Sequence, residues 1–199
     1  PTQLKHTQIR LSRRGGALKD NHTIIRLGIS ACLLGKKVRY DGGHKLDRFL
    51  IHALGRHVEW VPICPETGTG MPIPREALYL VGDPESPRLV TIQTKRDYTD
   101  QMRAWAKKRL DELATVGLHG FIFKSKSPSC GLHQVPVHTE TGRPIGVSSG
   151  IFVREVMRRF PLLPLEEGRY LHDMLRWENF VERVLAYRHR VSSVGRESD

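Results

Sequence analysis

The sequence predicts an α/β fold with one open, mainly parallel sheet and helices on both of its faces. Apolar runs of strand length alternate with helical patterns, in the order β-α-β, hairpin, α-β, loop, α-β-α. Such alternation is typical of a parallel sheet. The 199 residues are 39% hydrophobic, which suits a single domain with a sizeable core. We therefore expect one Rossmann-like domain that carries a small β-hairpin insertion.

The two ends of the chain are expected to lie outside this domain. Residues 1–22 show little periodicity, and Asp20 is their only acidic residue. Their basic residues are Lys5, Arg10, Arg13, Arg14 and Lys19. We interpret residues 1–22 as a flexible basic arm, residues 23–190 as the domain and residues 191–199 as a frayed tail.

In the first half of the chain, strands are expected where β-branched and aromatic residues lie between turn signals. They cover residues 24–30, 58–63, 77–81 and 89–93, of which the last two form the hairpin. A helix over residues 46–54 is expected to end near Gly55. Residues 64–76 contain three prolines and two glycines, which favours a rigid loop over a helix.

In the second half, the strongest helical pattern covers residues 97–116, with Gly117 suited to its C-terminal cap. Residues 125–147 are rich in serine, proline and glycine, which indicates a long loop. Ser148 or Ser149 is expected to cap the helix that follows. The remaining elements are a strand at 120–124, a helix at 150–159, a buried strand at 161–165 and a helix at 168–187. The apolar face of that last helix comprises Leu171, Met174, Leu175, Val181, Val184 and Leu185.

Three cysteines occupy the same local position, at or beyond the end of an expected strand. Cys32 follows the first strand, Cys64 the second, and Cys130 a polar loop after the strand at residues 120–124. If these strands run parallel in one sheet, all three thiols reach the edge where open α/β sheets bind ligands. Their odd number and wide spacing argue against a disulfide framework, so we expect a cytoplasmic protein whose thiols serve a metal or catalysis. No apolar run approaches the length of a membrane helix, and no membrane association is expected.

Three thiolates on separate loops suit a metal or a cluster better than a nucleophile, since a catalytic cysteine needs one thiol and a nearby base. A closed zinc site requires a fourth ligand and usually shows C-x-x-C pairs, which the sequence lacks. A [4Fe–4S] cube with three protein thiolates leaves one iron open as a Lewis acid, for which a substrate sulfur is a natural ligand. A zinc-dependent hydrolase and an RNA-binding protein with structural cysteines remain as alternatives.

Four segments closely resemble the signature segments of the thiouracil desulfurase (desulfidase) family. They are S-A-C-L-L-G-K-K-V-R-Y-D-G-G at residues 30–43, C-P-E-T-G-T-G-M-P-I-P-R-E at 64–76, K-S-K-S-P-S-C-G at 124–131 and E-E-G-R-Y-L-H-D at 166–173. The resemblance implies a [4Fe–4S] cluster on Cys32, Cys64 and Cys130 with one open iron. It implies replacement of the sulfur of a thiolated uracil by oxygen, without net redox change and with release of sulfide. The acid and the hydroxyl that assist in the family map onto Glu66 and Ser127.

The residues themselves support these two roles. Glu66 follows Cys64 by two positions on a stiff loop, so its carboxylate is placed to activate water or to carry a proton. The Ser127 hydroxyl is placed to hydrogen-bond the pyrimidine edge. Further candidates for substrate binding are Arg39, Asp41, Lys124, Ser125, Lys126 and Ser129. Arg75 and Glu76 are expected either to take part in the site or to form only a structural ion pair, and the sequence favours neither alternative.

The charge of the chain bears on the size of the substrate. A formal charge of +11 and a pI near 10.0 favour anionic partners such as nucleotides or RNA, although non-specific basicity explains them equally well. The expected substrate is a small thiolated pyrimidine or nucleotide, and thiolated tRNA is the alternative.

Overall fold

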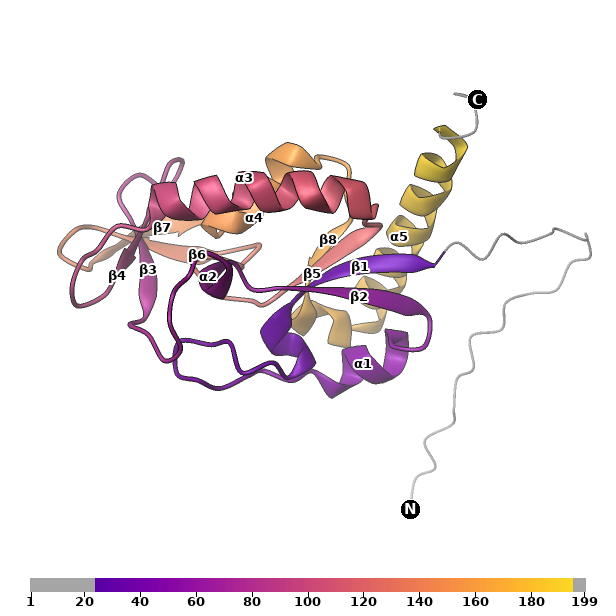
Figure 1. Cartoon of the computed structure of the whole chain (residues 1–199), viewed down its shortest axis with the longest axis horizontal. Coiled ribbons are helices and arrows are strands. Elements are labelled where there is room, and N and C mark those ends of the chain that lie inside the picture. Colours follow the sequence, from indigo (N-terminus) through magenta and orange to yellow (C-terminus); the bar gives the residue numbers. More distant parts are fainter. Residues whose placement is uncertain (1–23, 195–199) are drawn as a thin grey trace, which may run out of the picture.

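The computed structural model describes residues 24–194 of the chain. The expected arm at residues 1–22 lies outside the described residues, as do residues 195–199. Two four-stranded sheets form the framework, and helices pack along them (Figure 1). None of the helices in the described range combines the length and the apolar character that crossing a membrane requires.

The first sheet confirms the expected α/β fold. Its strands are β1 (Ile25–Ser30), β2 (Val58–Ile63), β5 (Gly120–Phe123) and β8 (Leu165–Glu167), in the order β2-β1-β5-β8. Every neighbouring pair is parallel. The carboxyl ends of β1, β2 and β5 therefore lie next to one another at one edge of the sheet.

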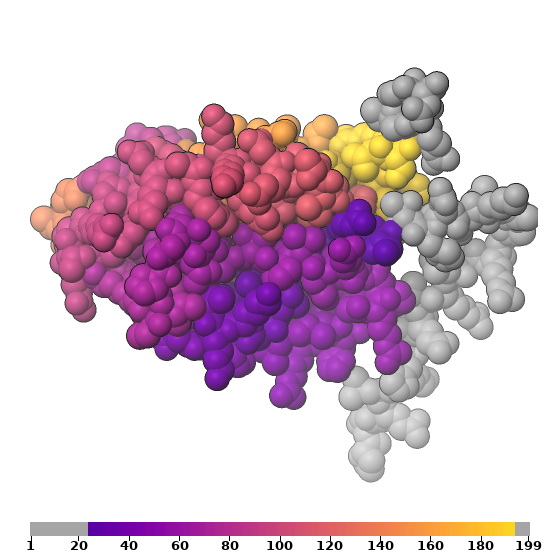
Figure 2. All heavy atoms as spheres, viewed as in Figure 1, coloured from indigo at the N-terminus to yellow at the C-terminus, as the bar shows by residue number. Residues whose placement is uncertain are grey.

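Helices bury both faces of this sheet. On one face, Leu27 and Ile122 pack with α1 (Arg48–Leu54) and α5 (Met174–Val194). On the other, Phe121 and Phe123 pack with residues of α3 (Thr99–Val116) and α4 (Ile151–Arg159). Figure 2 shows α3 as a ridge along the upper side of the molecule, with the indigo-to-magenta part of the chain below it. The alternation of side chains along each strand thus fills two separate cores.

Close packing on the α3 face depends on a glycine in β1. A Cβ atom at Gly28 would lie 2.3 Å from the ring of Phe121 on the neighbouring strand. Glycine at this position therefore lets the Phe121 ring pack directly against β1.

The second sheet is larger than the expected hairpin insertion. Its strands are β3 (Leu78–Val81), β4 (Arg88–Thr91), β6 (Val135–His138) and β7 (Pro144–Ser148), in the order β4-β3-β6-β7. The hairpin of β3 and β4 is confirmed. The long loop expected at residues 125–147 is wrong, because β6 pairs with β3 and with β7. The serine, proline and glycine content favours a loop, but hydrogen bonding to β3, a strand distant in sequence, makes residues 135–138 a strand.

Several element boundaries also differ from the expectation. Residues 64–76 begin with a short helix, α2 (Pro65–Gly68), because proline suits the first helical position, where its missing N–H costs nothing. The buried strand lies at β8 rather than at residues 161–165. Neither Ser148 nor Ser149 caps α4, whose N-cap is Gly150, because these hydroxyls donate to backbone carbonyls of Pro84 and Leu132.

The C-terminal helix differs from its expected form at both ends. Residues Gly168–His172 form a 3₁₀ turn, and α5 begins only at Met174. It extends to Val194, so the expected frayed tail is wrong for residues 191–194. The expected apolar face is wrong at Met174, Leu175 and Leu185, which are 64%, 77% and 37% exposed. Trp177 and Phe180 supply the buried face in their place, since the helix starts after the 3₁₀ turn and its phase changes there.

Candidate functional site

The three cysteines line one cavity of about 200 Å³ at the carboxyl edge of the first sheet. Cys32 lies in η1, the short 3₁₀ helix Ala31–Leu34 that follows β1. Cys64 directly follows β2 as the N-cap of α2. Cys130 lies in the turn after β5, and none of the three is in a disulfide. Strand order and parallel pairing thus bring together thiols that are far apart in the sequence.

The cavity is unfavourable for free thiolates. Burial raises the pKa of the Cys32 thiol to about 11, and the neighbouring Cys64 sulfur adds to the rise. Burial also raises the pKa of Cys130 well above its ordinary value. Lys124 and Arg39 lower the pKa of Cys32, but they do not offset burial. A cationic metal group would stabilise the thiolates here, and binding it would displace thiol protons.

The turn that carries Cys130 is held from two sides. The Ser127 hydroxyl accepts a hydrogen bond from the backbone N–H of Cys130 at 3.1 Å. The start of α4 packs against the same turn, with the Gly150 N–H donating to the Gly131 carbonyl at 2.8 Å. A Cβ atom at Gly150 would lie 2.5 Å from the Ser129 carbonyl. The position of the thiol therefore depends on this close backbone contact.

Replacing Gly150 by alanine is expected to push the Cys130 turn outward. Backbone cannot yield as a flexible side chain does, so we expect a loss of about 1–3 kcal/mol in the free energy of unfolding. Iodoacetamide should also alkylate Cys130 of the metal-free protein several-fold faster, as measured by mass spectrometry of its peptide. Gly142→Ala is the matched control: it introduces strain at a φ of +88° with open space around it, so Cys130 alkylation should not change. Equal alkylation rates in Gly150→Ala and wild type would contradict the prediction.

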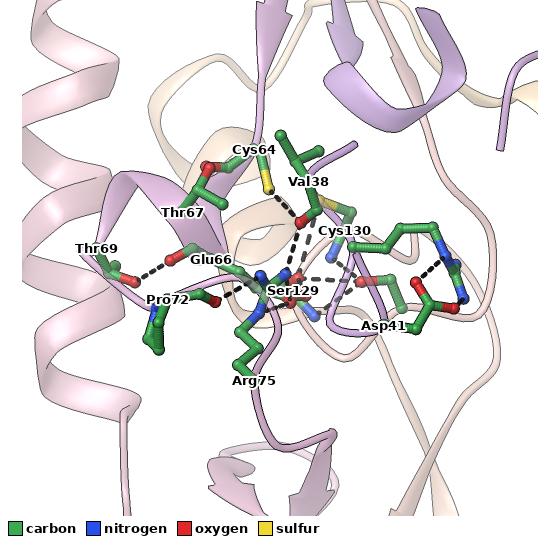
Figure 3. A network of polar contacts seen from close by, with 12 residues as sticks. Val38, Asp41, Cys64, Glu66, Thr67, Thr69, Pro72, Arg75, Ser129 and Cys130 are labelled. Carbon is green, nitrogen blue, oxygen red and sulfur yellow. Dashed lines mark hydrogen bonds and ion pairs between the residues drawn. The ribbon is translucent and has the colours of Figure 1, made fainter. Parts of the chain in front are cut away.

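A carboxylate reaches the cavity from α2. Glu66 accepts a hydrogen bond at Oε1 from the Ser129 hydroxyl at 2.6 Å (Figure 3). At Oε2 it accepts from Arg75 Nε at 2.9 Å and from Arg75 Nη2 at 2.5 Å. The alternative of a structural ion pair between Arg75 and Glu76 is therefore wrong. The chain between α2 and β3 turns Arg75 back toward Glu66 in α2. Glu76 instead accepts hydrogen bonds from the backbone N–H and the hydroxyl of Thr94.

Ser127 and Ser129 form a row of hydroxyls that ends on Glu66. Their Oγ atoms are 3.0 Å apart. A hydroxyl has one hydrogen, and that of Ser129 is donated to the Glu66 carboxylate. Ser127 must then donate to Ser129, so the row has one direction, from Ser127 through Ser129 to Glu66.

Most of the other expected binding residues also line this cavity. Arg39, Lys124 and Lys126 do so together with Glu66, Ser127 and Ser129. Arg39 is held by Asp41, whose carboxylate accepts from it at 3.3 and 3.1 Å. Burial lowers the pKa of Lys124, and its ammonium donates to the Ser125 carbonyl. The cavity thus has cationic groups on the side of the turn at residues 124–131 and at Arg39.

Two expected residues do not line the cavity, and others were not expected. Asp41 is exposed and contacts Arg39, and the buried Ser125 borders a neighbouring hollow with Lys45 and Arg169. Unexpected lining residues include Ser30, Tyr40, Ala77 and Leu78. Tyr40 lies within the segment at residues 30–43 that resembles the family's signature, so the sequence could have identified it as a candidate site residue. Leu78 is the first residue of β3 in the second sheet and Ala77 directly precedes it; no local pattern indicates where that sheet lies.

The donor set fits a cluster better than a single ion. In residues 24–194, no group of three His, Cys, Asp or Glu side chains could hold one metal ion. In a [4Fe–4S] cube each thiolate binds a different iron, so its ligands stand further apart than those of one ion. The three thiols that line the common cavity are sulfur ligands of the type that such a cluster takes.

Comparisons with known proteins match this region. A family model described as 2-thiouracil desulfurase matches residues 27–168. The uncharacterised protein YbbK of Bacillus subtilis (strain 168) is 29% identical over 128 residues, which are 62% of this chain and 83% of YbbK. A solved structure described as the [4Fe-4S]-dependent thiouracil desulfidase TudS has a TM-score of 0.60 and 27% identity, covering 78% of this chain and 98% of that one. The family match spans all three cysteines and Glu66.

Proposed function

The chain belongs to the 2-thiouracil desulfurase family, and we propose that it is a [4Fe–4S]-dependent desulfidase acting on a thiolated uracil. The reaction replaces the C=S sulfur by oxygen, without net redox change, and releases sulfide. The similarity to a [4Fe-4S]-dependent thiouracil desulfidase supports this. The observation that carries it is the convergence of three thiols and the Glu66 carboxylate on one cavity.

Cys32, Cys64 and Cys130 are the residues that would hold the cluster. The chain has no other cysteine, so a fourth iron would have no cysteine thiolate of this chain. When bound, the cluster supplies a Lewis acid for the thiocarbonyl sulfur. The three ligands would come from three different loops that border one cavity.

Glu66 is the base in this proposal. Its Oε1 atom accepts a proton from the water that attacks the ring carbon carrying the sulfur. Ser129 holds Oε1 in place through its hydrogen bond. Ser127 donates to Ser129 without substrate, and rotation of its hydroxyl turns the same hydrogen toward the pyrimidine edge.

The substrate in this proposal is a small thiolated pyrimidine, as the free base, the nucleoside or the monophosphate. The cavity of about 200 Å³ must hold the cluster as well as the reacting group, which favours a single small ring as that group. Arg39, Lys124 and Lys126 supply cationic groups at the cavity for an anionic substituent.

Anaerobic reconstitution tests the proposal. We expect a brown protein with about four irons per chain that converts 2-thiouracil, 4-thiouracil or thiouridine monophosphate to the oxygenated product and sulfide in equal amounts without an added reductant. Thiolated tRNA is assayed alongside. Isolation with zinc and no iron, or RNA binding without any turnover, would count against the desulfidase and in favour of a zinc hydrolase or an RNA-binding protein respectively.

A further inference from the structure

Arg75 is buried in the wall of the cavity and commits its donors to the protein. Its side chain is 5% exposed. It donates twice to Glu66 Oε2, once to the Val38 carbonyl at 2.8 Å and once to the Pro72 carbonyl at 3.2 Å. A guanidinium has five N–H donors, so little of it remains for a substrate. Its place in the cavity is therefore better explained by its action on Glu66.

The hydrogen bonds leave Glu66 with one distinct free acceptor position. A carboxylate has about four lone-pair positions, two on each oxygen. Arg75 occupies both positions on Oε2, and Ser129 occupies one on Oε1. Among the hydrogen bonds of the described residues, the remaining position is on Oε1, the oxygen that ends the serine row.

We propose that Arg75 is a positioning residue that directs the basic lone pair of Glu66 into the cavity. By binding Oε2 with two donors, it stops the carboxylate from rotating about its last bond and keeps Oε1 on Ser129. The expected effect of Arg75 on catalysis rests on the proposed function. The orientation of the Glu66 carboxylate does not, because it depends only on hydrogen bonds within the protein. Two N–H donors of one planar guanidinium converge on Oε2, an arrangement that the single ammonium of lysine does not reproduce.

A double-mutant cycle tests the role. We expect Arg75→Ala to lower kcat on the preferred thiolated pyrimidine about 30- to 100-fold, the scale of a misplaced reacting group, with KM changed less than about threefold. Arg75→Lys, which keeps one donor and the charge, should recover part of that loss. In a Glu66→Gln background, Arg75→Ala should change kcat by less than about threefold, because both residues act through one atom. Iron per chain and the cluster absorbance should match wild type in every variant.

Arg88→Ala is the matched control, since Arg88 pairs with two carboxylates, Asp97 and Glu140, in an exposed position. It should leave kcat and KM unchanged. A rise in KM with unchanged kcat in Arg75→Ala would overturn the inference and assign Arg75 to substrate binding. Equal losses in both backgrounds would also overturn it.

A second readout separates this inference from the proposed function. In crystal structures of Arg75→Ala and Arg75→Lys, the Glu66 carboxyl should leave its wild-type orientation or occupy more than one. An inactive wild-type protein would refute the desulfidase, and the orientation of Glu66 would still decide the role of Arg75. An unmoved Glu66 carboxyl in both variants would refute the positioning role.

Discussion

Replacing Cys130 by serine is expected to remove nearly all turnover and most of the bound iron. Serine has nearly the same shape as cysteine, but its hydroxyl is a poor ligand for iron in a cluster. The loss of activity should exceed the about 10- to 100-fold that removal of an outer partner of a metal ligand costs. Cys32→Ser and Cys64→Ser should behave alike, because each would remove one of three ligands. Iron analysis after anaerobic reconstitution, together with the desulfidation assay, measures both effects.

The control for this prediction is the fold of the metal-free protein. Cys130 lies within a turn held by two hydrogen bonds, from the Cys130 N–H to the Ser127 hydroxyl and from the Gly131 N–H to the Ser127 carbonyl. Neither bond involves the Cys130 side chain, so replacing sulfur by oxygen leaves both in place. The thermal unfolding midpoint of metal-free Cys130→Ser should therefore stay close to that of metal-free wild type. A Cys130→Ser protein that binds a full complement of iron would show that Cys130 is not a ligand.

Glu66→Gln is expected to keep its iron and lose about 10²- to 10⁴-fold in kcat, the range associated with loss of a general base. The amide retains the size of the carboxylate but not its basicity. It must also turn its oxygen toward Arg75, which is a donor, and its NH₂ toward Ser129. Ser129 would then accept where it now donates, and the direction of the serine row would be lost. Steady-state assays on reconstituted protein, with iron measured on the same samples, test this.

The matched control is Glu76→Gln. Glu76 lies ten positions further along and accepts hydrogen bonds from Thr94 rather than from groups in the cavity. We expect its kcat to equal that of wild type, with a small loss of stability. Wild-type turnover in Glu66→Gln would remove Glu66 from the reaction and leave the base to be found elsewhere in the cavity.

Much of the site followed from local signals. Cys32, Cys64 and Cys130 each follow an apolar run, and the strand expected at residues 58–63 agrees with β2 at both ends. Glu66 and Ser127 were indicated by the resemblance of their motifs to the family's signature segments, and their short distance in sequence from a cysteine agreed with that assignment. The parallel order of the strands then brings these loops to one cavity.

The sequence-based predictions of secondary structure are wrong where a strand or a side chain has its hydrogen-bond partner far away in the sequence. Strands β6 and β7 look like loop because Pro136 and Gly146 lie within them, yet the buried Val135 and Val137 pair into the second sheet. Strand β8 was misplaced because its glutamates look exposed. Glu167 is in fact fully buried, and it accepts from the backbone N–H of Leu132 and from the side chain of Arg169.

The sequence by itself determined the class of fold and indicated the three thiols and the Glu66 carboxylate that line one cavity, because hydrophobic periodicity and short motifs are properties of neighbouring residues. Only the tertiary structure decided that Arg75 clamps Glu66 rather than Glu76, and that Ser129 rather than Ser127 contacts the carboxylate. Directional hydrogen bonds depend on distances of a few tenths of an ångström between separate loops. Those distances are set by how the sheets and helices pack, which no local pattern contains.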